Sequence, residues 1–279
     1  MALFVLIYGL LIGSFLTVCI YRIPFSRAEQ GDDIPEGMEV SIIKPARSLC
    51  PSCRQMIPWY NNIPVFSWLA LGGKCGNCKA KISIRYPFTE LLTALIAIGA
   101  YSVYGLSLEG CLVFIYLAAL IVISFIDYDY FIIPDTISIP GTMIGLILAA
   151  ANGYFSFLKA PFVPGITSAL WGLVWGAGLL YTIAKGYEWI RKEDGLGFGD
   201  VKLLAMCGVF FGPECCLYTI FVGSVVGAVF GILGIIIFRR GLKQEIPFGP
   251  YLNTATALYL LTGEALPNWW FGLIAKLVS

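Results

Sequence analysis

The strongest constraint on the fold of this chain is a succession of apolar stretches that are long enough to cross a bilayer. Hydrophobic residues make up 58% of the 279 residues and charged residues only 13%, whereas a soluble domain carries about 25% charged residues. We therefore expect an all-α polytopic membrane protein with about eight transmembrane helices. The expected spans are 2–21, 88–105, 110–126, 136–152, 165–185, 201–213, 216–238 and 252–275.

The distribution of Lys and Arg predicts the orientation of these helices. If the N-terminus lies outside, only Lys159 and Lys276 of the 18 basic residues fall outside, which satisfies the positive-inside rule. The first apolar stretch has no basic residue before it and is followed by Arg22 and Arg27, so we interpret it as a retained helix rather than a cleaved signal peptide. An even number of spans then places both termini outside. The segments assigned to the inside are 22–87, 127–135, 186–200 and 239–251.

The polar segment 22–87 contains two Cys-x-x-Cys motifs, formed by Cys50 with Cys53 and by Cys75 with Cys78. Four thiolates on two tight turns can close a tetrahedron around Zn²⁺, so the motifs predict a small zinc-ribbon-like domain. A metal would supply folding energy that the small core of this segment lacks. Four thiolates leave no open position for water, which favours a structural rather than a catalytic zinc. The alternative is a redox dithiol or disulfide pair, which the reducing cytoplasmic side disfavours.

Aromatic and proline residues lie between the two cysteine motifs, namely Pro58, Trp59, Tyr60, Pro64, Phe66 and Trp68. We expect them to pack beneath the cysteine turns or to lie at the lipid interface, where Trp and Tyr are enriched. A groove for a peptide or a cofactor is the alternative.

The composition excludes one group of catalytic mechanisms and gives no support for one class of partner. The chain has no histidine, which rules out the Ser-His-Asp triad, the Cys-His pair and the His-containing zinc-protease motif. Any hydrolytic chemistry must therefore come from carboxylates, Lys, Cys, Ser or a cofactor. The net charge of +1 offers no reason to expect a nucleic acid as a partner.

Carboxylates at two expected span ends are the candidate reactive groups. Asp200 ends the glycine-rich stretch 195–200 and precedes an apolar run, so it either caps the following helix or serves a function. Asp127 directly follows an apolar run and should point into the helix bundle, because lipid is untenable for a carboxylate. We expect Asp129 to lie in the loop and Asp135 to act as a helix N-cap. Two inward carboxylates at one depth can share a proton and activate water, which predicts peptide hydrolysis.

An ordered series of short motifs runs along nearly the whole chain. The motifs are Gly13-Ser14-Phe15-Leu16, Tyr21-Arg22-Ile23-Pro24, the two Cys-x-x-Cys motifs, Ala70-Leu71-Gly72-Gly73-Lys74-Cys75, Arg85-Tyr86-Pro87 with Glu90, Ile126-Asp127, Ile133-Pro134-Asp135, Gly197-Phe198-Gly199-Asp200-Val201-Lys202-Leu203-Leu204 and Ile246-Pro247-Phe248-Gly249-Pro250-Tyr251. In these motifs the chain resembles the type IV prepilin peptidases, which are bacterial leader peptidase–N-methyltransferases and GxGD aspartyl proteases.

The resemblance implies an activity, a location and a set of site residues. The two catalytic residues of the family fall on Asp127 and Asp200. The implied reaction removes the leader of type IV prepilins and type II secretion pseudopilins at a Gly–Phe junction, on the cytoplasmic side of the bacterial inner membrane. The second implied activity is N-methylation of the new N-terminus with S-adenosylmethionine, and it is associated with the cytoplasmic segment. Neither spacing nor composition identifies a methyl-donor site in this segment. Gly73 and Lys74 are the candidate residues for it, and the alternative is that they only form the turn before the second cysteine motif.

The predicted organisation is a first transmembrane helix at 1–21, a cytoplasmic four-cysteine zinc-binding domain with the methyltransferase region at 22–87, and a transmembrane aspartyl peptidase domain at 88–279. The expected partners are prepilin and pseudopilin substrates, membrane lipids and, as an open possibility, a second copy of the chain. Three alternatives remain at this point. The chain could be a peptidase without methyltransferase activity, a carboxylate-relay transporter, or a membrane-anchored docking module of a secretion assembly.

Overall fold

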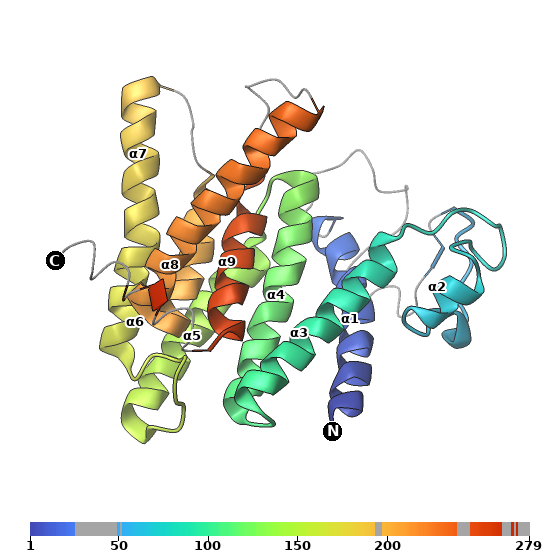
Figure 1. Cartoon of the computed structure of the whole chain (residues 1–279), viewed down its shortest axis with the longest axis horizontal. Coiled ribbons are helices and arrows are strands. Elements are labelled where there is room, and N and C mark those ends of the chain that lie inside the picture. Colours follow the sequence, from blue (N-terminus) through green and yellow to red (C-terminus); the bar gives the residue numbers. More distant parts are fainter. Residues whose placement is uncertain are drawn as a thin grey trace. The chain divides into compact units, whose positions relative to one another are not determined.

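The structure, a computed structural model, describes residues 1–25, 49–50, 52–192, 197–238, 246–263, 269–270 and 272. Secondary structure in these ranges is helical apart from two isolated β-bridges, Leu49 with Met56 and Lys74 with Lys81 (Figure 1). The expected all-α class is therefore confirmed for the described part of the chain. The chain divides into two compact units, of which unit 1 comprises 1–105 and 114–122, and unit 2 comprises 106–113 and 123–279.

Six of the described helical stretches are long and apolar enough to cross a membrane. They are Ala2–Pro24, Arg85–Tyr104, Leu108–Tyr130, Asp135–Phe155, Ile166–Ile190 and Phe198–Gly234. The predicted last span, 252–275, starts inside helix α9 (Gly249–Leu261), and much of its remainder lies outside the described residues. The first predicted span ends too early, because helix α1 continues past residue 21 to Phe25.

Unit 1 is built on two closely packed membrane helices, α1 (Ala2–Phe25) and α3 (Arg85–Tyr104). Glycines on α1 permit this close approach. A Cβ on Gly9 would lie 2.7 Å from Cα of Ala94, and one on Gly13 would lie 2.6 Å from Cα of Glu90. Small residues let helix backbones approach in this way inside membranes. Between the two helices the chain forms the short helices η1 (Trp59–Asn62) and α2 (Phe66–Ala70).

Helix α4 (Leu108–Tyr130) contributes its middle to unit 1 and both ends to unit 2. Its first turn is capped by the Ser107 hydroxyl, which accepts a hydrogen bond from the backbone N–H of Gly110 at 3.0 Å. The helix ends at Phe131, which adopts a left-handed conformation with φ of 54°. Asp129 therefore lies in the last turn of α4, and the prediction that it lies in a loop is wrong.

The rest of unit 2 is an assembly of helices around a buried apolar core, in which Ala149, Val163, Ala169 and Val209 pack together. Gly172 and Gly208 bring α6 and α8 into such close contact that a Cβ on either glycine would collide with the backbone of the other. The elements are α5 (Asp135–Phe155), α6 (Ile166–Leu173), the π-helical segment η2 (Val174–Gly178), α7 (Leu179–Arg191), α8 (Phe198–Phe238) and α9 (Gly249–Leu261).

Helix α8 turns back on itself at Gly212 and Pro213, where Gly212 has a φ of 82°. Residues eight positions apart in a straight helix are separated by about 12 Å along the axis. The sulfur atoms of Cys207 and Cys215 lie only 3.6 Å apart, and the sulfur of Cys216 lies 3.6 Å from the carbonyl oxygen of Leu204. The two predicted spans 201–213 and 216–238 therefore correspond to the two arms of α8.

Candidate functional site

Asp127 occupies the last full turn of α4 and is only 6% exposed, as expected for a carboxylate that points into the bundle. Its backbone carbonyl accepts a hydrogen bond from the N–H of Phe131 at 2.8 Å, which closes the helix. Its side-chain oxygen Oδ2 accepts a hydrogen bond from the backbone N–H of Gly249 at 3.0 Å. One oxygen of this buried carboxylate is therefore held by a backbone donor.

Gly249 is the first residue of α9, and its N–H is one of the amide groups that have no partner within their own helix. The positive end of the helix dipole also favours a carboxylate at this point. A Cβ at position 249 would lie 2.6 Å from Oδ2 of Asp127, so a side chain has no room there. Glycine is therefore required for the carboxylate to reach the start of α9.

Asp200 is the third residue of α8 and is 7% exposed. The helix begins at Phe198, and the backbone N–H of Asp200 donates to the carbonyl oxygen of Gly197 at 3.1 Å. Asp200 is thus inside the first turn, and the interpretation of Asp200 as the helix cap is wrong. Its oxygen Oδ1 is buried without a hydrogen-bond partner among the described residues.

Ile133 links the surroundings of the two carboxylates. A Cβ on Gly199, the neighbour of Asp200, would lie 2.9 Å from Cβ of Ile133. A Cβ on Gly249, the partner of Asp127, would lie 3.4 Å from Cδ1 of the same isoleucine. The charge of Asp127 also acts on Asp200. Two carboxylates from α4 and α8 therefore share one apolar, buried region of unit 2.

A second polar contact lies one helical turn deeper between the same two helices that meet at Asp127. The side-chain amide of Asn253 on α9 donates to the hydroxyl of Ser124 on α4 at 2.8 Å. Neither Ser124 nor Asn253 was predicted to belong to the site. Ser124 lies three residues before Asp127, and Asn253 lies four residues after Gly249, which is about one helical turn in each case. Nothing in the sequence indicates that these two helices are in contact.

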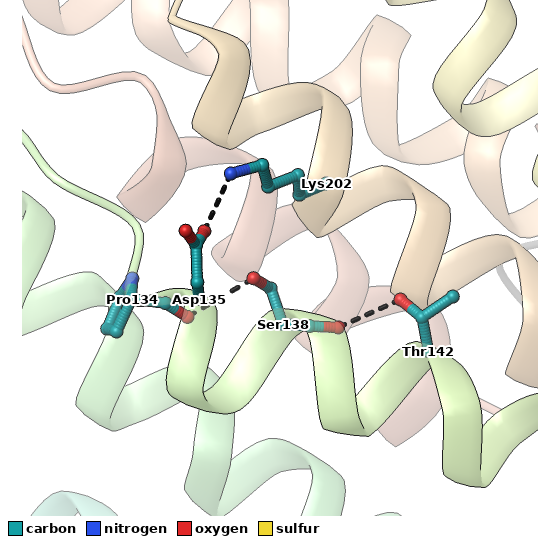
Figure 2. A network of polar contacts seen from close by, with 5 residues as sticks. All are labelled: Pro134, Asp135, Ser138, Thr142 and Lys202. Atoms are coloured by element: carbon teal, nitrogen blue, oxygen red, sulfur yellow. Dashed lines mark hydrogen bonds and ion pairs between the residues drawn. The ribbon is translucent and has the colours of Figure 1, made fainter.

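An ion pair joins α5 to α8 two residues beyond Asp200. The Nζ atom of Lys202 lies 2.7 Å from Oδ1 of Asp135 (Figure 2). The same atom lies 5.2 Å from the centre of the Phe198 ring. Helix α5 begins at Asp135, but its N-cap position is Pro134, so the prediction that Asp135 is the N-cap is wrong. The carboxylate of Asp135 instead ties the start of α5 to the first turns of α8.

Figure 2 also shows two side-chain hydrogen bonds in the first turns of α5, next to this ion pair. The hydroxyl of Ser138 donates to the carbonyl oxygen of Pro134 at 3.1 Å, and the hydroxyl of Thr142 donates to that of Ser138 at 2.8 Å. Both hydroxyl groups thus find a hydrogen-bond acceptor in the backbone of their own segment and need no partner from another helix.

The arrangement in unit 2 supports acid–base chemistry on a water molecule. Two buried carboxylates in one apolar region can share one proton, so one acts as a base while the other acts as an acid. Asp127 has one oxygen bonded to Gly249, whereas Asp200 has a buried oxygen without a partner among the described residues. No histidine is needed for this chemistry.

Unit 1 brings together the four predicted metal ligands, Cys50, Cys53, Cys75 and Cys78. Their sulfur atoms all lie within 4.8 Å of one another, and those of Cys50 and Cys78 are 3.8 Å apart. A tetrahedral site with Zn–S bonds of about 2.3 Å would separate its sulfurs by about 3.8 Å. The cluster therefore fits a structural metal with four thiolate ligands.

Backbone amides of the two turns donate hydrogen bonds to the cysteine sulfurs, which favours their thiolate forms. Hydrogen bonds from the backbone N–H groups of Cys78 and Asn77 lower the pKa of Cys75 to about 6. The N–H of Gln55 likewise lowers the pKa of Cys53. The N–H of Ala80 favours the Cys78 thiolate, but desolvation and the neighbouring sulfurs outweigh it and raise the pKa of Cys78 to about 11. Four thiolates so close together repel one another, which a divalent cation would offset.

The predicted methyl-donor residues Gly73 and Lys74 lie in the turn before the second cysteine motif. Gly73 has a φ of 67°, and a Cβ there would lie 2.9 Å from the ring of Trp68. The indole N–H of Trp68 in turn donates to the carbonyl oxygen of Ile82 at 3.2 Å. Gly73 is therefore required by the packing of Trp68, whereas the Lys74 side chain is exposed. Their assignment to the methyl donor stays a prediction.

Comparisons with known proteins agree along nearly the whole length of the chain. The sequence model of the bacterial peptidase A24 N-terminal domain matches residues 7–104, and that of the type IV leader peptidase family matches residues 114–232. No solved structure matches the chain significantly.

Several curated relatives bear the name prepilin leader peptidase/N-methyltransferase. The one from Stutzerimonas stutzeri is 36% identical over 94% of this chain and 90% of its own length. The one from Neisseria gonorrhoeae is 35% identical over 95% of this chain and 92% of its own length. The one from Aeromonas salmonicida is 34% identical over 97% of this chain and 94% of its own length. The chain therefore belongs to the type IV leader peptidase family.

Proposed function

We propose that this protein is a membrane-embedded aspartic endopeptidase that removes the basic leader of type IV prepilins and type II secretion pseudopilins, and that it then N-methylates the new N-terminus. The observation that carries the peptidase is the pair of buried carboxylates, Asp127 and Asp200, which α4 and α8 bring into one apolar region of unit 2. The names of the relatives support both activities.

In the proposed reaction, one of the two aspartates takes a proton from a water molecule as the oxygen of that water attacks the scissile carbonyl carbon. The other aspartate is protonated and donates a hydrogen bond to the carbonyl oxygen, which stabilises the charge that develops there. The C–N bond then breaks, and a proton passes from the dyad to the departing amine. Asp127, held by Gly249, has the more fixed position. We therefore assign the initial protonated role to Asp200, whose Oδ1 has no hydrogen-bond partner among the described residues.

The proposed site for the second activity is in unit 1. When bound, S-adenosylmethionine would supply a methyl group to the free amine that cleavage produces, with release of S-adenosylhomocysteine and a proton. We propose that the exposed Lys74 side chain and the backbone of Gly73 contact this donor. We further propose that the metal of the four-cysteine cluster is Zn²⁺ and that it holds the two cysteine turns around this segment.

The proposed location is the bacterial inner membrane, where the six apolar helices fit a multi-pass protein. Following the positive-inside rule, we place both termini outside and both the four-cysteine cluster and the aspartate pair at the cytoplasmic face. A homodimer remains a prediction. The carboxylate-relay transporter is not favoured, because the relatives are named as peptidases.

The experiment that tests the peptidase uses purified full-length protein, a model prepilin and a gel assay of leader removal. Asp127→Asn and Asp200→Asn should each abolish cleavage while the metal content stays at the wild-type level. The matched control is Asp129→Asn, which changes a carboxylate in the same helix turn as Asp127 and should cleave normally. Full activity of either Asp127→Asn or Asp200→Asn would overturn the proposed dyad. A mass increase of one methyl group on the product N-terminus tests the second activity separately.

A further inference from the structure

Unit 1 exposes a set of large apolar side chains on η1 and α2, which we call the η1–α2 surface and define as Trp59, Tyr60, Phe66 and Leu69. These side chains are 79%, 56%, 70% and 62% exposed, respectively. Packing beneath the cysteine turns, one of the two expectations for this segment, is therefore wrong for Trp59, Tyr60 and Phe66. Trp68 fits that expectation, because its ring packs on Gly73, and Pro64 is buried as well. Apolar side chains gathered in this way usually mark a contact surface.

The η1–α2 surface is attached directly to a membrane helix. Oε2 of Glu90, in the second turn of α3, accepts a hydrogen bond at 2.7 Å from the backbone N–H of Val65, the residue before α2. Glu90 is buried, and the side chain of Ser14 on α1 also bonds its carboxylate. Phe66 follows Val65 in the chain, so the η1–α2 surface is held beside the first turns of a helix that is apolar enough to span the membrane.

The charged residues in the stretch of sequence that carries this surface are all basic. From Cys50 to Thr89 the sequence contains no Asp or Glu. The same stretch contains Arg54, Lys74, Lys79, Lys81 and Arg85. Cationic segments next to a membrane helix are attracted to anionic lipid headgroups, by about 1 kcal/mol for each basic residue near the surface. An acidic surface would be repelled from such lipids, and a basic peptide would be repelled from this segment.

We propose that the η1–α2 surface docks onto an anionic lipid leaflet, with Trp59, Tyr60, Phe66 and Leu69 at the boundary between headgroups and acyl chains. Trp and Tyr prefer this boundary because their rings are apolar and their N–H or O–H groups stay hydrated. Phe66 and Leu69 are three residues apart on α2 and so share one helix face. The basic residues named above supply the attraction to the lipid phosphates. This inference is independent of the proposed reaction.

The test uses full-length protein in which a photoreactive p-benzoyl-phenylalanine replaces Trp59 or, in a second variant, Phe66. The matched control carries the same group at Ser52, which is exposed in the first cysteine turn and outside the η1–α2 surface. Each protein is reconstituted into phosphatidylglycerol vesicles and into phosphatidylcholine vesicles, irradiated, and analysed by mass spectrometry for lipid adducts. Metal content and melting temperature verify that each variant is folded.

We expect lipid adducts at positions 59 and 66 to exceed those at position 52 by about fivefold or more in phosphatidylglycerol, since only the first two positions contact acyl chains. Phosphatidylcholine should lower the adduct yield at least about threefold, and so should the double change Arg54→Gln with Lys81→Gln. Adducts to a second protein chain in place of lipid would overturn the inference. Lipid yields no higher than at position 52, or yields that do not depend on lipid charge, would also overturn it.

Discussion

The backbone N–H of Gly249 donates a 3.0 Å hydrogen bond to Oδ2 of Asp127, although 122 residues separate the two in the sequence. The contact joins the end of α4 to the start of α9 and leaves Asp127 with a fixed orientation. It also explains why the position needs glycine, because a Cβ there would lie 2.6 Å from the carboxylate oxygen. The start of α9 is thus part of the candidate active site, alongside the two aspartates.

Replacement of Gly249 by Ala should lower the rate of prepilin cleavage by about tenfold or more, which corresponds to about 1.4 kcal/mol. The added methyl group displaces the Asp127 carboxylate or the start of α9. The measurement is the cleavage rate of purified protein at saturating and at limiting substrate. Gly186→Ala is the matched control, because nothing lies within 4 Å of a Cβ at that helical position. An unchanged cleavage rate in Gly249→Ala would show that the Asp127–Gly249 contact does not matter.

The ion pair between Lys202 and Asp135 should contribute little to overall stability, because both side chains are partly exposed to solvent. We expect Lys202→Met and Asp135→Asn each to change the free energy of unfolding by about 1 kcal/mol or less. The double variant should lose less than the sum of the two single changes, because the pair is broken only once. Thermal inactivation of all four proteins at low and at high salt measures this coupling. Strictly additive losses would contradict a direct interaction.

Loss of one cysteine should weaken metal binding by the four-cysteine cluster in unit 1 without stopping cleavage in unit 2. Cys75→Ser should lower the metal content well below that of the wild type and destabilise the segment around the two cysteine turns, because a structural site of this kind stabilises its own fold. Cleavage should persist, since the aspartate pair belongs to the other compact unit. Elemental analysis and the gel assay measure the two effects. Cys111→Ser, an exposed cysteine outside the cluster, is the control and should keep its metal.

Removal of the Glu90 carboxylate should loosen α2 from α3. Glu90→Ala leaves the partly buried Val65 N–H without its acceptor, and we expect a loss of about 1 kcal/mol. Hydrogen exchange at the Val65 amide should then become faster, whereas Glu90→Gln keeps an acceptor oxygen and should change the exchange less. Glu188→Ala removes an exposed carboxylate that pairs with Lys185 and serves as the control. Equal exchange rates in wild type and Glu90→Ala would contradict the anchoring role.

Properties that depend on local sequence were predictable without coordinates. Apolar stretches long enough to cross a bilayer identified the membrane helices, since span length follows from helix rise and bilayer thickness. The spacing of the Cys-x-x-Cys motifs predicted a four-thiolate cluster, and the structure brings Cys50, Cys53, Cys75 and Cys78 together. The chain has no histidine, and a carboxylate in a membrane helix must point away from lipid. These two facts predicted Asp127 and Asp200 as the reactive groups.

Contacts between distant parts of the chain were decided only by the tertiary structure. Asp135 could be placed at the start of a helix from its neighbours, but its partner Lys202 comes from another helix. The sequence likewise contained Gly249 in a recognisable motif, yet nothing local shows that its N–H meets Asp127. Hydropathy and motif spacing report what a segment can form by itself. Which helix ends meet depends on how glycines such as Gly208 let the helices pack, a property of the whole assembly.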